Sequence, residues 1–272
     1  MSLKSTASLI LAAMTLSGAA LAQTAALAAP APDWTVTGNA GLYTDYRFRG
    51  FSQTDYGPAF QGGIDLAHKS GFYLGNWNSN VSSNLFNGAS LEIDLYGGYK
   101  GAITDDLGFD VGLIYYYYPK SGQGSTFNTV GTAKIDNTEV YFGLTYGPVY
   151  GKLYYAVNDY FDLAKAGGVP RSTKGTTYLD LGYSQEFSGI IVGAHLGYLT
   201  LEENRQFVDA RGRVLSKSVT DYKVSVGTDV GNGYILTGAI VGTNKKEYFA
   251  TGTPSTENGG KTKLVVSLSK SF

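Results

Sequence analysis

The sequence predicts an all-β fold, a transmembrane up-and-down antiparallel β-barrel of about 12 strands. Side chains alternate between apolar and polar along most of the chain, and charges fall almost without exception on one face. A period of two is typical of strands, in which successive side chains point to opposite faces. In the stretch 91–95, for example, Leu, Ile and Leu alternate with Glu92 and Asp94. The connections between such stretches are alternately short and long, which favours a membrane barrel over a soluble sandwich.

The first residues predict a targeting segment rather than part of the barrel. A lysine near the start is followed by an apolar stretch at 9–16 and by an Ala-Leu-Ala cleavage motif at 20–22. The apolar stretch is too short for a membrane anchor, which needs roughly 20 apolar residues, and no later segment approaches that length. We therefore expect a signal peptide at 1–22, with alternative cleavage after Ala28. Because no later segment could cross a membrane as a helix, we expect residues 33–272 to form a closed sheet, an outer-membrane barrel.

Alternation begins after a short Ala/Pro spacer and continues to the end of the chain. The first predicted strand places Trp34 and Leu42 on one face and Asp45, Arg47 and Arg49 on the other. Most later strands repeat this pattern, although the third alternates less clearly, so the count is predicted to within two strands. The predicted strands are 34–49, 60–66, 72–81, 91–95, 107–113, 139–144, 152–158, 179–183, 190–199, 221–228, 234–241 and 263–272.

The connections predict which end of the barrel faces which compartment. Outer-membrane barrels join their strands by short turns on the periplasmic side and by longer loops outside the cell. An even number of strands returns both ends of the chain to the periplasmic side. The short connections are 67–70, 101–106, 147–149, 185–189 and 231–233, and the long ones include 119–136, 161–175, 201–220 and 244–261.

The last strand carries a predicted assembly signal. It alternates up to Phe272 and resembles the closing strand of bacterial outer-membrane barrels, whose terminal Phe is read by the barrel-assembly machinery. Lys270 departs from that pattern, which usually has an apolar residue there. Close to the membrane interface, its long side chain is expected to reach the headgroups at little cost.

Composition argues against several classes of function. The net charge of −1 gives no basic field for nucleic acid. The chain has no Cys and only two histidines, His68 and His195, neither in a recognisable catalytic or metal-binding motif. We therefore expect no enzyme activity, no metal and no cofactor. A lipid-modifying enzyme is the least favoured alternative, and it would depend on His195.

The ionisable residues on the polar face predict a pore, because charges near the bilayer midplane must face the lumen. A barrel of about 12 strands is also wider than the kind that side chains fill. We expect passive diffusion of small polar solutes, with weak cation preference because acidic residues predominate. Equally open is the alternative that opposite charges pair and hold a plug-like network. The pore-lining candidates are Asp45, Arg47, Arg49, Asp65, Glu92, Asp94, Asp110, Glu139, Lys152, Asp180, Asp221 and Lys223.

Two of these candidates, Arg47 and Arg49, are predicted to emerge at the outer mouth at the end of the first strand. A guanidinium group there could hold a carboxylate or phosphate of a solute. It could also pair with Asp45, Glu92 or Asp221, and pairing is the favoured interpretation.

The block D-Y-R-F-R-G-F-S-Q-T at 45–54, followed by G-P-A at 57–59 and Q-G-G at 61–63, resembles the TorF porin family. The resemblance extends to the ending S-L-S-K-S-F at 267–272, where a lysine at the position of Lys270 is usual in that family. It implies a Gram-negative outer-membrane location, with lipid, lipopolysaccharide, the assembly machinery and small solutes as partners. It implies no catalytic residues, and the oligomeric state is not predicted. A non-conducting barrel serving adhesion or membrane structure is the alternative.

Overall fold

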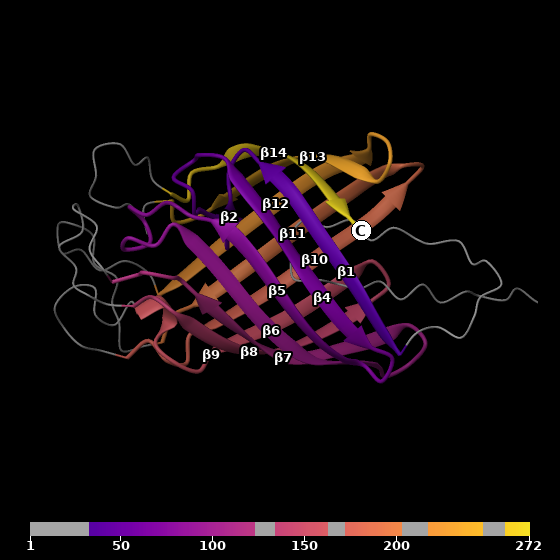
Figure 1. Cartoon of the computed structure of the whole chain (residues 1–272), viewed down its shortest axis with the longest axis horizontal. Helices are drawn as coiled ribbons and strands as arrows, with labels where there is room; N and C mark the ends of the chain where they lie inside the picture. The colour runs from indigo at the N-terminus through magenta and orange to yellow at the C-terminus, as the bar shows by residue number, and fades with distance from the viewer. Residues whose placement is uncertain (1–32, 123–133, 163–171, 203–216, 247–258) are drawn as a thin grey trace, which may run out of the picture.

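A computed structural model describes residues 33–122, 134–162, 172–202, 217–246 and 259–272. It contains a closed antiparallel barrel (Figure 1), so the predicted all-β fold is confirmed. The strands neighbour one another in chain order, and the last pairs with the first. The barrel strands are β1 (Trp34–Tyr43), β4 (Ala59–His68), β5 (Phe72–Asn80), β6 (Leu91–Ala102), β7 (Leu107–Tyr117), β8 (Asn137–Tyr146), β9 (Val149–Ala156), β10 (Thr177–Phe187), β11 (Ile190–Thr200), β12 (Ser218–Asp229), β13 (Tyr234–Thr243) and β14 (Lys263–Ser271).

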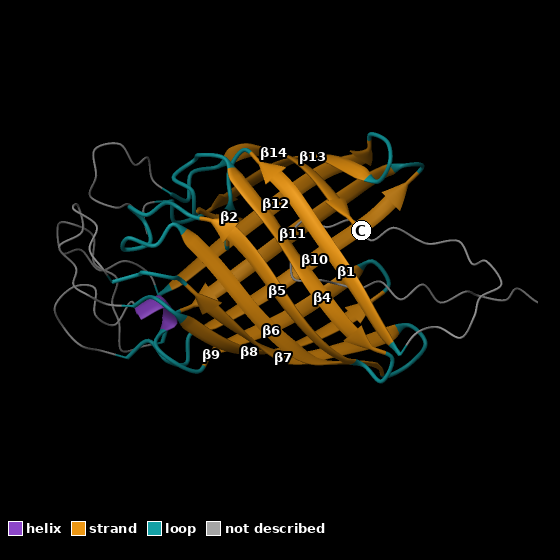
Figure 2. Ribbon diagram, viewed as in Figure 1, coloured by secondary structure: helices purple, strands orange, loops and turns teal. Residues whose placement is uncertain are grey.

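Short turns gather at one end of the barrel and longer connections at the other (Figure 2). In the turn between β12 and β13, Asn232 and Gly233 have φ angles of 56° and 76°. Such left-handed pairs match the twist of the flanking strands, which is why Asn-Gly suits tight hairpins. We call the half of the barrel next to the short turns and the C-terminus the turn half. The half next to the connecting residues 44–58, 81–90, 157–162 and 172–176 is the loop half.

The barrel closes between β1 and β14. Leu42 lies opposite Leu268, and the main chain of Gly38 exchanges hydrogen bonds of 2.7 and 2.9 Å with Phe272. The Phe272 ring lies directly against Gly38, so a side chain at that position would collide with it. Close by, the Lys270 Nζ atom is 4.7 Å from the centre of the Tyr234 ring. The end of the chain is therefore a packed part of the seam.

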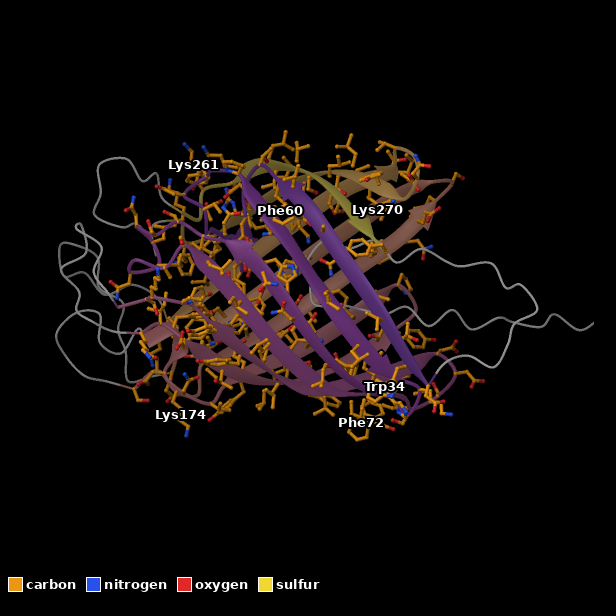
Figure 3. All side chains as sticks on the ribbon, viewed as in Figure 1. Trp34, Phe60, Phe72, Lys174, Lys261 and Lys270 are labelled. Carbon is orange, nitrogen blue, oxygen red and sulfur yellow. The ribbon has the colours of Figure 1, made fainter. Side chains whose placement is uncertain are left out.

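The exterior of the barrel is apolar. The outward side chains Phe60, Leu74 and Leu264 are 62, 63 and 61% exposed, and similar residues occur on every barrel strand. Figure 3 shows Trp34 and Phe72 at the turn end of the molecule and the lysines Lys174 and Lys261 towards the loop end. Such an apolar exterior is suited to contact with lipid. The closed sheet also satisfies its backbone hydrogen bonds internally, as a membrane-spanning structure must.

The first strand is shorter than predicted. We expected it to continue to residue 49, whereas β1 ends at Tyr43. The chain then turns into the barrel and forms a two-stranded sheet of β2 (Arg47–Phe48) and β3 (Phe51–Ser52). The alternation of Asp45, Arg47 and Arg49 therefore reflects this small hairpin, not a continued barrel strand. We call residues 44–58 the inward loop.

The buried core lies inside the loop half. Its members are mostly aromatic side chains from the loop-side ends of the strands, with additions from the inward loop and from the short 3-10 helix η1 (Tyr160–Asp162). Among the described residues, no helical segment is long and apolar enough to cross a membrane. The core includes Tyr46, Phe51, Trp77, Phe86, Ile114, Tyr116, Tyr118, Tyr141, Tyr154, Tyr160, Tyr178 and Leu199.

Candidate functional site

The inward loop is held together by Asp45. This carboxylate forms an ion pair with Arg47 and accepts hydrogen bonds from Ser52 Oγ at 2.6 Å and Thr54 Oγ1 at 3.1 Å. At the tip of the β2–β3 hairpin, Gly50 adopts a φ of 80°, where a side chain would meet the backbone carbonyl of Gly242 at 2.9 Å. The sequence therefore builds a compact hairpin that fits closely against the barrel wall.

Arg47 connects the inward loop to the start of β14. Its Nη1 atom donates to the carbonyl oxygens of Gly50, Gly259 and Lys261, at 2.9, 3.3 and 3.1 Å. The amide of Ser52 also donates to Gly259, at 2.9 Å. Pairing with Asp45 was among the predicted alternatives for this arginine. The prediction that it lies on a continuing barrel strand is wrong, because it belongs to the inward loop.

Arg49 crosses the lumen to β8. Its Nη1 and Nη2 atoms lie 3.0 and 2.7 Å from the two carboxylate oxygens of Glu139, and Nη1 also donates to the Tyr160 hydroxyl at 2.8 Å. The guanidinium carbon is 4.1 Å from the centre of the Tyr178 ring. The side chains of Arg49 and Glu139 are only 5 and 1% exposed. Glu139 was not among the predicted partners, so the structure corrects that part of the expectation.

Aromatic rings surround the tip of the inward loop. The Phe48 ring is 5.6 Å from that of Tyr116 and 5.8 Å from that of Phe161. Beyond it, the Tyr118 hydroxyl donates to Glu92 at 2.8 Å. The loop half is therefore filled by interlocking side chains from the strands, the inward loop and η1.

A row of polar residues from β10, β11 and β12 lies below this packing. His195 Nδ1 is 2.9 Å from Asp180 Oδ1, and its Nε2 is 2.8 Å from Asp221 Oδ1. The Tyr178 hydroxyl donates to Asp221 Oδ2 at 3.0 Å. His195 is not among the predicted pore-lining candidates, although the alternation of its strand places it on the polar face. Within the described part of the chain, no group of three or more side chains could hold a metal ion.

The turn half holds a second, more exposed network. Asp110 accepts hydrogen bonds from Lys152 Nζ at 2.7 Å and from the Tyr73 hydroxyl at 2.6 Å. Lys100 Nζ lies 4.4 Å from the centre of the Tyr73 ring. Sequence reasoning missed Lys100 because the predicted strand stopped at residue 95, whereas β6 continues to Ala102.

A cavity of about 150 Å³ lies between these groups, inside the barrel. It is lined by Tyr43, by residues 45–50 and by inward side chains of β4, β6, β7 and β9 to β14. Asp94 and Lys223 reach it from β6 and β12. The lining combines charged groups with the rings of Tyr116, Tyr154 and Tyr178, a combination typical of sites for small solutes.

All the sequence-predicted lumen residues lie inside the barrel, but the structure does not bring them all together. Some are tied in pairs, namely Arg47 with Asp45, Arg49 with Glu139 and Lys152 with Asp110. Glu92 is sealed under Tyr118, and Asp65 accepts a hydrogen bond from Tyr96 at 2.6 Å in the turn half. Those that line the cavity are Asp45, Arg47, Arg49, Asp94, Asp180, Asp221 and Lys223.

Known structures of two porins are similar to this barrel. The KdgM porin superposes with a TM-score of 0.50 at 10% identity, covering 87% of this chain and 99% of that one. The NanC porin gives a TM-score of 0.51 at 8% identity, covering 88% and 99%. Identities this low show a shared porin-like fold and nothing finer. No curated protein matches the sequence. A family model described as "Bacterial protein of unknown function (Gcw_chp)" matches residues 27–272, so the chain belongs to the Gcw_chp family.

Proposed function

We propose that this protein is an outer-membrane porin that lets small polar solutes diffuse passively across the outer membrane of a Gram-negative bacterium. The observation that carries the proposal is the cavity inside the closed barrel, lined by charged side chains and narrowed by the inward loop. Charged groups around a lumen are the usual means by which pores select solutes. The inward loop then acts as the constriction, since a barrel of this width is not filled by strand side chains alone.

The proposal includes the signals that direct the protein to the outer membrane. Residues 1–22 serve as the signal peptide, with cleavage after Ala28 as the alternative, and Phe272 serves as the signal to the assembly machinery. Outer-membrane lipid and lipopolysaccharide surround the barrel. We also propose that the chain belongs to the TorF porin family, on the basis of the sequence block at 45–54, which lies within the inward loop.

A weak preference for cations is part of the proposal. Three acids, Asp94, Asp180 and Asp221, line the cavity beside Lys223 and His195, whereas both arginines there are neutralised by Asp45 and Glu139. We expect the reversal potential in a salt gradient to show a mild excess of cation current. A clear excess of anion current would reject this part while leaving the porin intact.

Reconstitution of the purified full-length protein into planar bilayers tests the main proposal. We expect discrete conductance steps, and we expect liposomes containing the protein to swell in small sugars, amino acids or organic acids. Heat-unfolded protein at the same dose is the control for detergent leaks. Complete absence of steps in protein that migrates as a folded barrel would count against a porin.

That negative result would favour a non-conducting barrel with a structural or adhesive role. One observation supports this second candidate, because the core residues of the loop half, such as Ile114 and Tyr118, are almost completely buried. A barrel sealed there would block passage and still be stable in the membrane. Channel recordings separate the two functions directly.

We propose no enzymatic activity. His195 is the only histidine inside the described barrel wall that faces the lumen, and both of its ring nitrogens lie within 2.9 Å of carboxylates. The ring thus lies between two carboxylates of the barrel wall, and the hydroxyl within hydrogen-bond distance of it, that of Tyr178, is itself bound to Asp221. Hydrolysis or acyl transfer on lipopolysaccharide that is lost in a His195→Ala variant would overturn this view.

A further inference from the structure

Most ionisable side chains that line the cavity already interact with other charged side chains of the protein. Asp45 pairs with Arg47, and Arg49 pairs with Glu139. Asp180 and Asp221 lie on either side of His195. These groups therefore need no solute to satisfy them, and their role is to hold the wall of the cavity and the inward loop in place.

Asp94 is the exception among the acids that line the cavity. It is 3% exposed, and its Oδ1 atom is buried without a hydrogen-bond partner. Its neighbours in the register, Trp77 on β5 and Tyr116 on β7, donate no hydrogen bond to it within the described residues. Buried carboxylate oxygens are normally satisfied, because leaving one without a donor is costly. An unsatisfied carboxylate at a cavity wall is therefore suited to receive a donor from a ligand.

Lys223 is the corresponding exception among the cations. It lines the same cavity from β12, and the described residues provide no ion pair or hydrogen bond for its ammonium group. The acids that act on it electrostatically are Asp180 and Asp221, and both are held by His195. The cavity thus presents one uncommitted carboxylate and one uncommitted ammonium group.

We propose that this cavity binds a small zwitterion, a solute with one ammonium and one carboxylate group, whose ammonium contacts Asp94 and whose carboxylate contacts Lys223. The inference rests on the proposed porin function, since the solute reaches the cavity through the lumen. A singly charged solute would satisfy one of the two protein groups and leave the other unpaired, whereas a zwitterion satisfies both without adding net charge.

Size and surface of the cavity agree with such a solute. A cavity of about 150 Å³ is comparable to one that accommodates benzene, so it suits an amino acid with a short carbon chain. The rings of Tyr116, Tyr154 and Tyr178 provide apolar contact for that chain and a favourable surface for its cationic end.

Calorimetric titration of the detergent-solubilised full chain tests the inference. The probes are glycine, β-alanine and 4-aminobutyrate, which differ in the spacing of their charges, with butylamine and butyrate as the singly charged controls. We expect at least one zwitterion to bind about tenfold or more tightly than both controls. Equal binding of a control, or no binding of any zwitterion, would overturn the inference.

Substitutions then locate the site. Asp94→Asn and Lys223→Met should each weaken binding of the best zwitterion by about tenfold or more, because each removes one charged contact. The matched controls are Asp65→Asn and Lys100→Met, which remove inward charges outside the cavity and should change this affinity by less than about twofold. Barrel folding of every variant is checked by circular dichroism. Unchanged affinity in either folded cavity variant contradicts the assignment, and the two variants are independent if one fails to fold.

Channel recordings on the same preparation separate the two levels of inference. Conductance steps without zwitterion binding would remove the binding site and leave the porin. Zwitterion binding without conductance would support the site and contradict the porin.

Discussion

The two halves of the barrel share the same strands but differ inside. In the loop half the inward groups are large and sealed, as with Tyr116 at 4% exposure and the Arg49–Glu139 pair. In the turn half the main ion pair, Lys152 with Asp110, has side chains that are 9 and 14% exposed. The difference arises because the inward loop fills one half and not the other. A barrel of this width is thus packed by an inserted segment, while the strands alone leave room for solvent.

Removing that segment should give the largest effect. Replacing residues 46–53 by a short Gly-Ser linker is expected to raise single-channel conductance several-fold, because the tip that fills the loop half and lines the cavity is lost. Planar-bilayer recordings measure the change. Inserting the same linker into the exposed turn at 103–106, outside the barrel, is the matched control and should leave conductance unchanged. Unaltered conductance after removal of the tip would show that the inward loop is not the constriction.

Charged pairs allow a direct comparison of the halves. Arg49→Met leaves Glu139 almost fully buried without a counter-charge and with only the hydrogen bond from Tyr116, so we expect the free energy of unfolding to fall by about 3–5 kcal/mol. Lys152→Met should lower it by only about 1–2 kcal/mol, because Asp110 keeps its hydrogen bond from Tyr73 and some access to solvent. Urea unfolding in lipid vesicles measures both. The double variant Arg49→Met/Glu139→Met should recover much of the loss, and equal losses in the two single variants would contradict the distinction between the halves.

Single hydroxyl groups should show the same contrast on a smaller scale. Tyr118→Phe removes the donor to Glu92, whose other carboxylate oxygen already lacks a partner, and should cost about 1–3 kcal/mol of unfolding free energy. Tyr96→Phe removes the donor to Asp65 in the turn half, where water can replace it, and should cost less than about 1 kcal/mol. The same urea experiment compares them, with a larger loss for Tyr96→Phe as the result that would argue against a hydrated turn half.

Periodicity was enough to predict the barrel, because each charged residue on a half-buried strand must face the lumen. Local pattern could not reveal the inward loop, since Asp45, Arg47 and Arg49 alternate in a two-stranded hairpin as they would in a barrel strand. The partner of Arg49 was also out of reach. Glu139 lies 90 residues away in the chain, and only the closed topology and the depth of the loop bring the two together. Asp94 and Lys223 are predicted to face the lumen, but that Asp94 Oδ1 lacks a donor and that both acids acting on Lys223 are held by His195 follows only from the full set of contacts.

Ion selectivity should give the smallest and most specific difference. Asp65 is partly exposed in the turn half, so Asp65→Asn removes a charge that passing ions can sense and should move the reversal potential slightly towards anions. Glu92 is 1% exposed beneath Tyr118, so Glu92→Gln should leave the reversal potential unchanged even if it alters stability. Recordings in a potassium chloride gradient compare the two variants at equal salt. Equal shifts would mean that the conducting path in the loop half runs as close to Glu92 as the path in the turn half runs to Asp65, and Glu92 would then not be sealed beneath Tyr118.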